Sequence, residues 1–242
     1  MNYDRAFYIN LDGSERRRRA LLRSCRRAGL EPPERFPAID GRRVQLAPYQ
    51  AEGILTPDME VKMAGSLGCF LSHITIWKMI HADPTCEVGL IIEDDARLTR
   101  SFRSRLEAIP APPADWDMLW LGYFRARGQA VDEWFLRPDF PSRRSDNSGH
   151  FCYLVRSASV PKLLQVLTPY NNLNSKDVLL RKRFDQFNAY FLRQRIATST
   201  RRSPFSDRKR ANARGADGGF WRGLWAEIQR KTGRRRPSGQ QG

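Results

Sequence analysis

The nine residues from Val88 to Ala96 constrain the fold of this chain more than any other stretch. They begin with a continuous apolar run, which is typical of a short buried strand and is too short for an unsupported helix. The run ends abruptly in three carboxylates, Glu93, Asp94 and Asp95. Because ligands bind beyond the carboxyl ends of strands in open α/β sheets, the sequence predicts an acidic ligand site at the end of this strand.

Three adjacent carboxylates repel one another, and a bound cation would relieve that repulsion. Oxygen ligands suit hard cations, so one interpretation is a Mn²⁺ or Mg²⁺ ion held by Glu93, Asp94 and Asp95, which in turn holds a phosphate. Side chains alternate along an extended chain, which favours Glu93 and Asp95 as the metal-binding pair. The alternative is a solvated acidic turn that binds nothing. The sequence patterns on either side of the triplet bear on the choice between a metal site and such a turn.

The flanking segments alternate between strand and helix patterns. An apolar run at 6–11 predicts a first strand, Ser14 is a suitable N-cap for a helix from Glu15, and Gly29 is a suitable end. Later runs predict strands at 36–41, 115–122 and 149–155, and helices at 65–81, 102–109, 157–167 and 178–180. This order predicts an α/β fold with a largely parallel sheet.

Two helix starts are candidate phosphate sites. Backbone N–H groups of Gly65 and Ser66 at the start of the helix predicted at 65–81 can receive a phosphate, although close helix packing explains the Gly-x-x-Gly spacing equally well. Arg16 lies in the first turn of another helix, where arginine suits an anion. A solvated helix face is the alternative for Arg16, and it is the interpretation we favour for the three arginines that follow.

Two later segments leave alternatives open. The predicted loop at 123–148 carries Phe124, Trp134 and Phe135, which could stack on a sugar or pack as a lid. Asp177 precedes the last predicted helix, where it is either an N-cap or a further carboxylate of the site.

Charge is concentrated at the end of the chain. The formal net charge of +16 predicts an anionic partner. Residues 201–242 hold 12 Lys and Arg against 3 Asp and Glu, whereas the first 200 residues hold 30 against 23. We therefore expect a catalytic domain at 1–205 and a basic, partly amphipathic tail at 206–242.

The apolar side of the tail, at 220–231, suits the surface of an anionic membrane. A disordered basic tail, or a helix docked on the body, is the alternative. Nucleic acid is not an expected partner, because the tail matches no recognition module. The sequence shows no secretory h-region, no apolar run of spanning length and no zinc-type cysteine spacing. The expected location is cytoplasmic, with a peripheral position on the inner face of the cytoplasmic membrane.

Five blocks together resemble glycosyltransferase family 25, the bacterial lipooligosaccharide galactosyltransferase family, with collagen galactosyltransferases as distant relatives. They are Tyr8–Asp12 with Glu15 and Arg16, Phe36–Gly41, Gly65–His73 with Trp77, Leu90–Ala96, and Trp116–Asp117 with Leu121–Gly122. The resemblance implies a GT-A type nucleotide-sugar transferase fold, inverting transfer of a hexose from a UDP-sugar, and a divalent metal, usually Mn²⁺.

The resemblance also implies roles for particular residues. The acidic triplet of Glu93, Asp94 and Asp95 would be the metal-binding motif of such enzymes. The blocks around it would flank the nucleotide, so the resemblance implies a nucleotide-binding role for four residues: Asn10, Arg16, Gly65 and Ser66.

The resulting hypothesis is a metal-dependent hexosyltransferase that moves galactose from a UDP-sugar to a lipooligosaccharide, lipopolysaccharide or related surface glycan. A metal held by carboxylates would neutralise the departing nucleotide. A base must take the proton of the acceptor hydroxyl, and Asp146 and Asp177 are the candidates.

Two other functions fit parts of the sequence. A metal-dependent phosphodiester hydrolase would use the same carboxylates, but it usually needs more His or Asp ligands than the three histidines of this chain suggest. A non-catalytic, membrane- or nucleic-acid-associated basic protein would use the acidic strand end only structurally.

Overall fold

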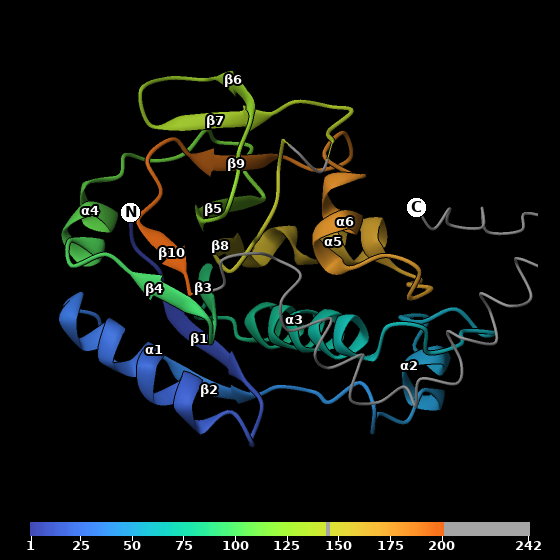
Figure 1. The fold of residues 1–242 in the computed structure, drawn as a ribbon. Helices are drawn as coiled ribbons and strands as arrows, with labels where there is room; N and C mark the ends of the chain where they lie inside the picture. The colour runs from blue at the N-terminus through green and yellow to red at the C-terminus, as the bar shows by residue number, and fades with distance from the viewer. Residues whose placement is uncertain (144–145, 201–242) are drawn as a thin grey trace, which may run out of the picture. The chain divides into compact units, whose positions relative to one another are not determined.

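The computed structural model describes residues 1–143 and 146–200, and within them ten strands form one sheet. Figure 1 shows the arrangement of strands and helices. The strands are β1 (Arg5–Asn10), β2 (Glu34–Pro37), β3 (Val88–Glu93), β4 (Ala96–Leu98), β5 (Met118–Gly122), β6 (Gly128–Ala130), β7 (Phe135–Pro138), β8 (Cys152–Arg156), β9 (Ala189–Leu192) and β10 (Ala197–Ser199). Their order across the sheet is β2-β1-β3-β8-β5-β9-β7-β6, and β10 pairs with β4 and β5.

Helices pack on both faces of this sheet. They are α1 (Glu15–Arg27), α2 (Ala47–Ala51), α3 (Ala64–Ala82), α4 (Phe102–Ala108), the 3₁₀ helix η1 (Ser157–Ser159), α5 (Val160–Leu167) and α6 (Lys176–Arg181). The buried apolar residues form two clusters, one shared with α3, α5 and α6 and the other with α1 and α4. Side chains of β3 point alternately to the two faces of the sheet and so contribute to both clusters: Ile91 belongs to the first, and Leu90 and Ile92 belong to the second.

The expectation of a largely parallel sheet is wrong, because the sheet is mixed. β1 is parallel to β2 and β3, and β5 is parallel to β9, but β8 lies antiparallel between β3 and β5. For β8 to run parallel to β5, a crossover connection would have to carry the chain back to the edge of the sheet where β5 begins. The described part of the connection from β5 to β8 contains no helix, so β8 starts at the edge where β5 ends and runs back.

The segment predicted as a loop at 123–148 contains the antiparallel hairpin of β6 and β7. Its aromatic residues are largely packed, since Phe135 is buried and Phe124 contacts Phe151 edge to face, with ring centroids 5.3 Å apart. Packing is therefore the better interpretation for these two side chains. The elements α2, β4, β9 and β10 were not predicted, because they are too short to show a clear periodic pattern.

Close packing decides the role of one glycine in the Gly-x-x-Gly pair. A Cβ on Gly68 would lie 2.1 Å from the carbonyl oxygen of Ile39, so α3 approaches the 39–41 segment along this residue. A Cβ on Gly65 would have no heavy atom within 4 Å. Packing therefore explains Gly68, and Gly65 remains open at the start of the helix.

We expect Gly68→Ala to lower the free energy of unfolding by about 1–3 kcal/mol or more, because the clashing atoms belong to the backbone and cannot rotate away. Gly65→Ala is the matched control at the same helix end. It is expected to be neutral or to stabilise the protein by up to about 1 kcal/mol, since alanine favours a helix. Urea unfolding of the two variants checks this, and equal effects would contradict the packing role of Gly68.

The predicted basic tail at 206–242 lies outside the described residues. Among the residues that the structure does describe, no helix combines the length and the apolar character needed to cross a bilayer.

Candidate active site

The acidic residues lie at the carboxyl end of β3, next to the ends of neighbouring parallel strands. β1 pairs with β3 so that Ile9 lies opposite Glu93. β5 reaches the same edge, because Ile92 of β3 and Gly122 of β5 both pair with Cys152 of β8. The prediction that the apolar run is a strand ending in acidic groups at a sheet edge is confirmed.

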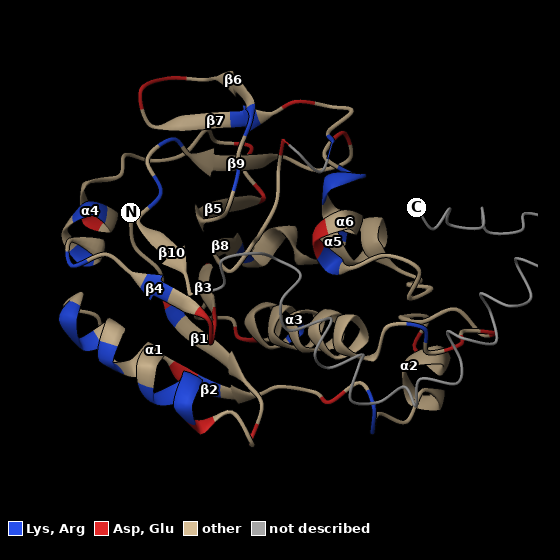
Figure 2. Ribbon diagram, viewed as in Figure 1, with Lys and Arg blue, Asp and Glu red and all other residues tan. Residues whose placement is uncertain are grey.

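The alternation expected beyond this strand does not occur. β3 ends at Glu93, and Asp94 and Asp95 form a turn before β4 begins. Figure 2 shows acidic residues at this junction between β3 and β4. Because the backbone turns here, the three carboxylates have different partners on different elements.

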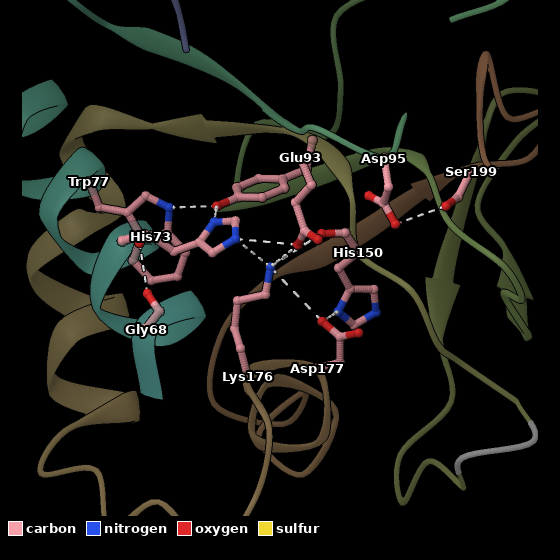
Figure 3. A network of polar contacts seen from close by, with 11 residues as sticks. Gly68, His73, Trp77, Glu93, Asp95, His150, Lys176, Asp177 and Ser199 are labelled. Carbon is pink, nitrogen blue, oxygen red and sulfur yellow. Dashed lines mark hydrogen bonds and ion pairs between the residues drawn. The ribbon is translucent and has the colours of Figure 1, made fainter. Parts of the chain in front are cut away.

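Glu93 contacts a buried ammonium group. Its Oε1 atom lies 3.0 Å from Nζ of Lys176 and 3.3 Å from Nε2 of His73. Lys176 Nζ lies 2.8 Å from the same His73 nitrogen (Figure 3). The Lys176 side chain is 3% exposed and that of Glu93 is 22% exposed. A charge buried to this degree requires a compensating partner, and Glu93 provides it.

The protonation states follow from these contacts. Burial disfavours the charged form of Lys176, but the Glu93 carboxylate raises its pKa above the ordinary value overall. Burial, assisted by the positive charge of Lys176, lowers the pKa of His73 to about 4. At neutral pH a charged Lys176 therefore donates to Nε2 of a neutral His73.

The tautomer of His73 then follows from the same hydrogen bonds. With Nε2 accepting, the proton lies on Nδ1 and is donated to the hydroxyl oxygen of Tyr153 at 2.6 Å. The indole N–H of Trp77 donates to the same oxygen at 2.9 Å. α3 and β8 thus hold the His73 ring in a fixed orientation toward Lys176.

Asp94 faces β1 and α1. Its Oδ2 atom accepts a hydrogen bond from the amide of Asn10 at 2.7 Å and lies 3.4 Å from Nε of Arg17. Arg16, the predicted anion-binding residue, is exposed on α1. The structure therefore brings Asn10 to the acidic residues and places Arg17 beside them.

Asp95 faces β10. It is 3% exposed, and its Oδ2 atom accepts a hydrogen bond from the hydroxyl of Ser199 at 3.0 Å. The backbone N–H of Thr200 donates to the carbonyl oxygen of Asp95 at 2.9 Å. Strand β10 thus holds the turn that presents this carboxylate.

Asp177 joins the same cluster from α6. Its Oδ1 atom lies 3.9 Å from Lys176 Nζ and 3.6 Å from Nδ1 of His150. The N-cap of α6 is Ser175, so the N-cap interpretation of Asp177 is wrong. Burial lowers the pKa of His150 to about 4, although the Asp177 carboxylate acts in the opposite direction. A neutral His150 therefore lies beside a partly exposed Asp177.

Asp146, the other base candidate, lies in a different environment. Its Oδ2 atom accepts the backbone N–H of Arg143 at 3.1 Å, and its Oδ1 atom lies 3.9 Å from Arg127. It lines a pocket of about 590 Å³ whose other charged residues are arginines: Arg125, Arg127, Arg193 and Arg195. The structure thus places Asp177, and not Asp146, with Glu93 and Lys176.

The remaining candidates lie at the start of α3. Gly65 is exposed, whereas Ser66 is 2% exposed. Among the described residues, the Ser66 hydroxyl and Oδ1 of Asn10 have no hydrogen-bond partner. Buried polar atoms are normally paired, so these two atoms are suited to a ligand.

The carboxylates do not form a site in which all three hold one ion. Within the described residues, the group of three possible ligands whose atoms lie within 4.8 Å of one another is Cys69, His73 and Glu93. A hard cation that bridges to a phosphate needs only one or two carboxylates. Asp94 and Asp95, in one turn, fit that requirement, whereas Glu93 Oε1 already contacts the ammonium of Lys176.

Sequence reasoning missed Lys176, His150 and Tyr153, and it did not predict the contact of His73 with Lys176. A lysine next to a candidate carboxylate, as in Lys176-Asp177, was the available signal. Nothing local indicated that Lys176 would be buried, because lysine is almost never buried without a partner. That partner, Glu93, lies 83 residues earlier in the chain.

Parts of this chain are similar in sequence to known proteins. A mouse procollagen galactosyltransferase 2 is 31% identical over 133 residues, which cover 50% of this chain and 21% of that protein. A glycosyltransferase 25 family member of Anopheles gambiae is 29% identical over 193 residues, which cover 74% of this chain and 31% of the relative. This chain therefore spans a fifth to a third of the length of these two relatives.

Two solved structures are distantly similar. A glycosyltransferase involved in glycosylation of the major capsid of PBCV-1 has a TM-score of 0.46 at 7% identity, covering 85% of this chain and 98% of that one. The apo form of the glycosyltransferase GlyE from Streptococcus pneumoniae has a TM-score of 0.41 at 13% identity. The match covers 78% of this chain and 45% of that one. The family assignment does not depend on these two structures.

The sequence model of one protein family matches nearly the whole part of the chain that the structure describes. Residues 4–198 match the model described as glycosyltransferase family 25 (LPS biosynthesis protein). The match contains the five blocks that resemble this family and the strand end where Glu93, Asp94 and Asp95 lie. The chain therefore belongs to glycosyltransferase family 25.

Proposed function

We propose that this protein is an inverting, metal-dependent transferase that moves a hexose from a UDP-sugar to a glycan acceptor, on a GT-A type fold. The observation that carries the proposal is the acidic turn at the carboxyl edge of the sheet in a chain of this family. Galactose is the proposed sugar because the relatives are named galactosyltransferases. A lipopolysaccharide or lipooligosaccharide acceptor is proposed because the family is described as LPS biosynthesis proteins.

Donor binding in this proposal uses the residues around the acidic turn. Asp94 and Asp95 would hold Mn²⁺ or Mg²⁺, which when bound supplies positive charge for the departing UDP. The donor-side residues are Asn10, Arg16, Gly65 and Ser66. We add Arg17, because its guanidinium reaches Asp94 at 3.4 Å and could also meet a phosphate.

Acceptor activation is assigned to Asp177. An inverting displacement needs a base that takes the proton of the attacking hydroxyl. Asp177 is 22% exposed and lies 3.9 Å from Lys176, whose other contacts include Glu93. Because Asp177 is partly exposed, the hydroxyl of an acceptor can reach its carboxylate.

We expect Asp177→Asn to lower the turnover number by about 10²–10⁴-fold, the usual contribution of a general base, with a smaller change in the KM for the donor. Asp146→Asn is the matched control, because Asp146 lines the arginine-rich pocket described above and contacts Arg127 there. Its turnover is expected to stay within a few-fold of the parent chain. If Asp146→Asn is the variant that loses turnover, the base assignment is reversed.

The proposed function is tested by incubating the full chain and Mn²⁺ with UDP-galactose, UDP-glucose or UDP-N-acetylglucosamine, with UDP release as the readout. Release that requires the metal and prefers one sugar supports the proposal. Absence of UDP-sugar binding and of any metal effect contradicts it. Hydrolysis of a simple phosphodiester, measured in parallel, would reveal the alternative hydrolase activity.

We also propose that the basic tail brings the enzyme to a lipid-linked acceptor on the inner face of the cytoplasmic membrane. Support comes from the sequence alone, since 201–242 carries 12 Lys and Arg against 3 Asp and Glu. Deleting residues 220–242 should release the protein from anionic vesicles in a sedimentation assay, while neutral vesicles bind neither form. Unchanged binding to anionic vesicles after the deletion would refute this role.

A further inference from the structure

The ammonium of Lys176 has the surroundings of a bound cation. Its Nζ atom lies 2.8 Å from Nε2 of His73, 3.0 Å from Oε1 of Glu93 and 3.3 Å from the carbonyl oxygen of His150. A lysine ammonium has three N–H donors, so these three acceptors use all of them. With the Cε atom of its own side chain, the nitrogen therefore has four neighbours, and the side chain is 3% exposed.

Two of these acceptors, His73 and Glu93, belong to a set of metal-type ligands. Cys69, His73 and Glu93 offer a sulfur, a nitrogen and an oxygen that lie within 4.8 Å of one another. Thiolate, imidazole and carboxylate are the ligands that Zn²⁺ takes in proteins. His73 Nε2 and Glu93 Oε1 are 3.3 Å apart, close to the separation of about 3.4 Å expected for two ligands of one tetrahedral Zn²⁺ ion.

The orientation of His73 also resembles that of a metal ligand. A metal-binding histidine usually donates its second ring N–H to a fixed partner, which sets the tautomer and aims the other nitrogen at the ion. Here Nδ1 contacts the hydroxyl of Tyr153 at 2.6 Å, and Nε2 points to Lys176 (Figure 3). Trp77 holds the same hydroxyl at 2.9 Å, so the ring is prearranged for a cation at Nε2.

We propose that Lys176 is the built-in cation of the Cys69–His73–Glu93 site: its ammonium takes the place of a metal ion, and its removal opens the site to Zn²⁺ or a similar soft divalent metal. Glu93 is then committed to Lys176. An exchangeable Mn²⁺ or Mg²⁺ would be left to Asp94 and Asp95. This inference concerns the binding of metals by the resting protein and does not depend on the proposed sugar transfer.

The placement of Lys176 explains why a tethered cation suits this position. Lys176 is the first residue of α6, and Asp177 follows it directly. The contacts of Lys176 with α3 through His73 and with β3 through Glu93 therefore hold the start of α6, and with it Asp177, against the acidic edge. A lysine is always present in the folded chain, whereas a metal would depend on supply. Lys176 is in this sense a positioning residue.

The test is a Co²⁺ titration of the full chain, since Co²⁺ replaces Zn²⁺ and its thiolate complexes absorb in the near ultraviolet. The parent chain is expected to show no Co²⁺–thiolate band. Lys176→Met, which removes the ammonium and leaves an uncharged side chain one atom shorter, is expected to bind one Co²⁺ per chain with at least about 100-fold higher affinity and with the thiolate band. The double variant Lys176→Met with Cys69→Ser should lose that band, which assigns it to Cys69 and not to another cysteine.

Two results would overturn the proposal. One is a parent chain that binds Co²⁺ through Cys69, because Lys176 would then not occupy the site. The other is a folded Lys176→Met variant, shown by its circular dichroism spectrum, that gains no Co²⁺ site.

If Lys176→Met does not fold alone, it is refolded with and without Zn²⁺, and Lys176→Gln is measured beside it. Recovery of folded protein only with Zn²⁺ supports the proposal. Failure of both variants to fold or to bind with Zn²⁺ contradicts it. Loss of UDP release in any of these variants bears only on the proposed function and leaves the metal result unaffected.

Discussion

Replacing Asp95 by Asn is expected to lower sugar transfer by at least about a hundredfold without unfolding the protein. In the proposed function Asp95 supplies negative charge for a metal that meets the departing UDP, and stabilisation of developing charge is usually the largest catalytic contribution. Asparagine has the same shape and keeps a carbonyl oxygen that can accept the hydrogen bond from Ser199, which is 3.0 Å away in the parent chain. The charge is lost while the turn is retained.

The measurement is UDP release as a function of Mn²⁺ concentration, together with the melting temperature of each variant. Asp117→Asn is the matched control, because Asp117 is also buried but accepts the backbone N–H of Asn188 at 2.7 Å, away from the acidic turn. This control is expected to lose stability and to keep its turnover per folded molecule. Full activity of Asp95→Asn at ordinary Mn²⁺ concentrations would remove Asp95 from the mechanism.

Acidification from pH 7 to pH 4 is expected to destabilise the protein strongly through two buried histidines. Burial lowers the pKa of His73 and of His150 to about 4, against 6.5 in an unfolded chain. Between these pH values the unfolded chain binds protons that the folded chain does not, so stability rises with pH and is lost as pH falls from about 6.5 to about 4. Each histidine contributes a loss of about 3 kcal/mol over that range.

Urea unfolding at several pH values checks this prediction. In His150→Phe, about half of the pH-dependent loss of stability should disappear, because one of the two buried imidazole rings is removed. The phenyl ring can still pack on Trp120, whose ring centroid is 4.8 Å from that of His150. The ring nitrogens of His150 have no hydrogen-bond partner among the described residues, so the polar contact that this substitution removes is the 3.6 Å approach of Nδ1 to Asp177. His81→Gln is the control, since His81 has an exposed hydrogen bond to the carbonyl oxygen of Ser157. Stability that stays constant between pH 6.5 and pH 4.5 would contradict neutral buried histidines.

Local sequence patterns determined most of the elements around the site. The apolar run before Glu93 predicted β3, and the residues after Ser14 predicted α1, because burial periodicity and capping are local properties. The same reasoning placed carboxylates at a strand end and indicated a ligand there. It failed for β8, whose direction depends on the edge of the sheet to which the chain returns. Short strands such as β10 also carry too few residues for a periodic signal.

What each carboxylate does was decided only by the tertiary structure. Asp94 meets Asn10 across 84 positions, Glu93 meets Lys176 across 83, and Asp95 meets Ser199 across 104. No local pattern encodes pairs so distant, because the fold brings them together by stacking strands and helices whose own signals concern only burial. The sequence by itself therefore determined that an acidic edge exists in a chain of this family. The tertiary structure decided that one of its three carboxylates holds a buried lysine, because only the packed fold places that ammonium beside His73 of α3, Glu93 of β3 and the carbonyl oxygen of His150.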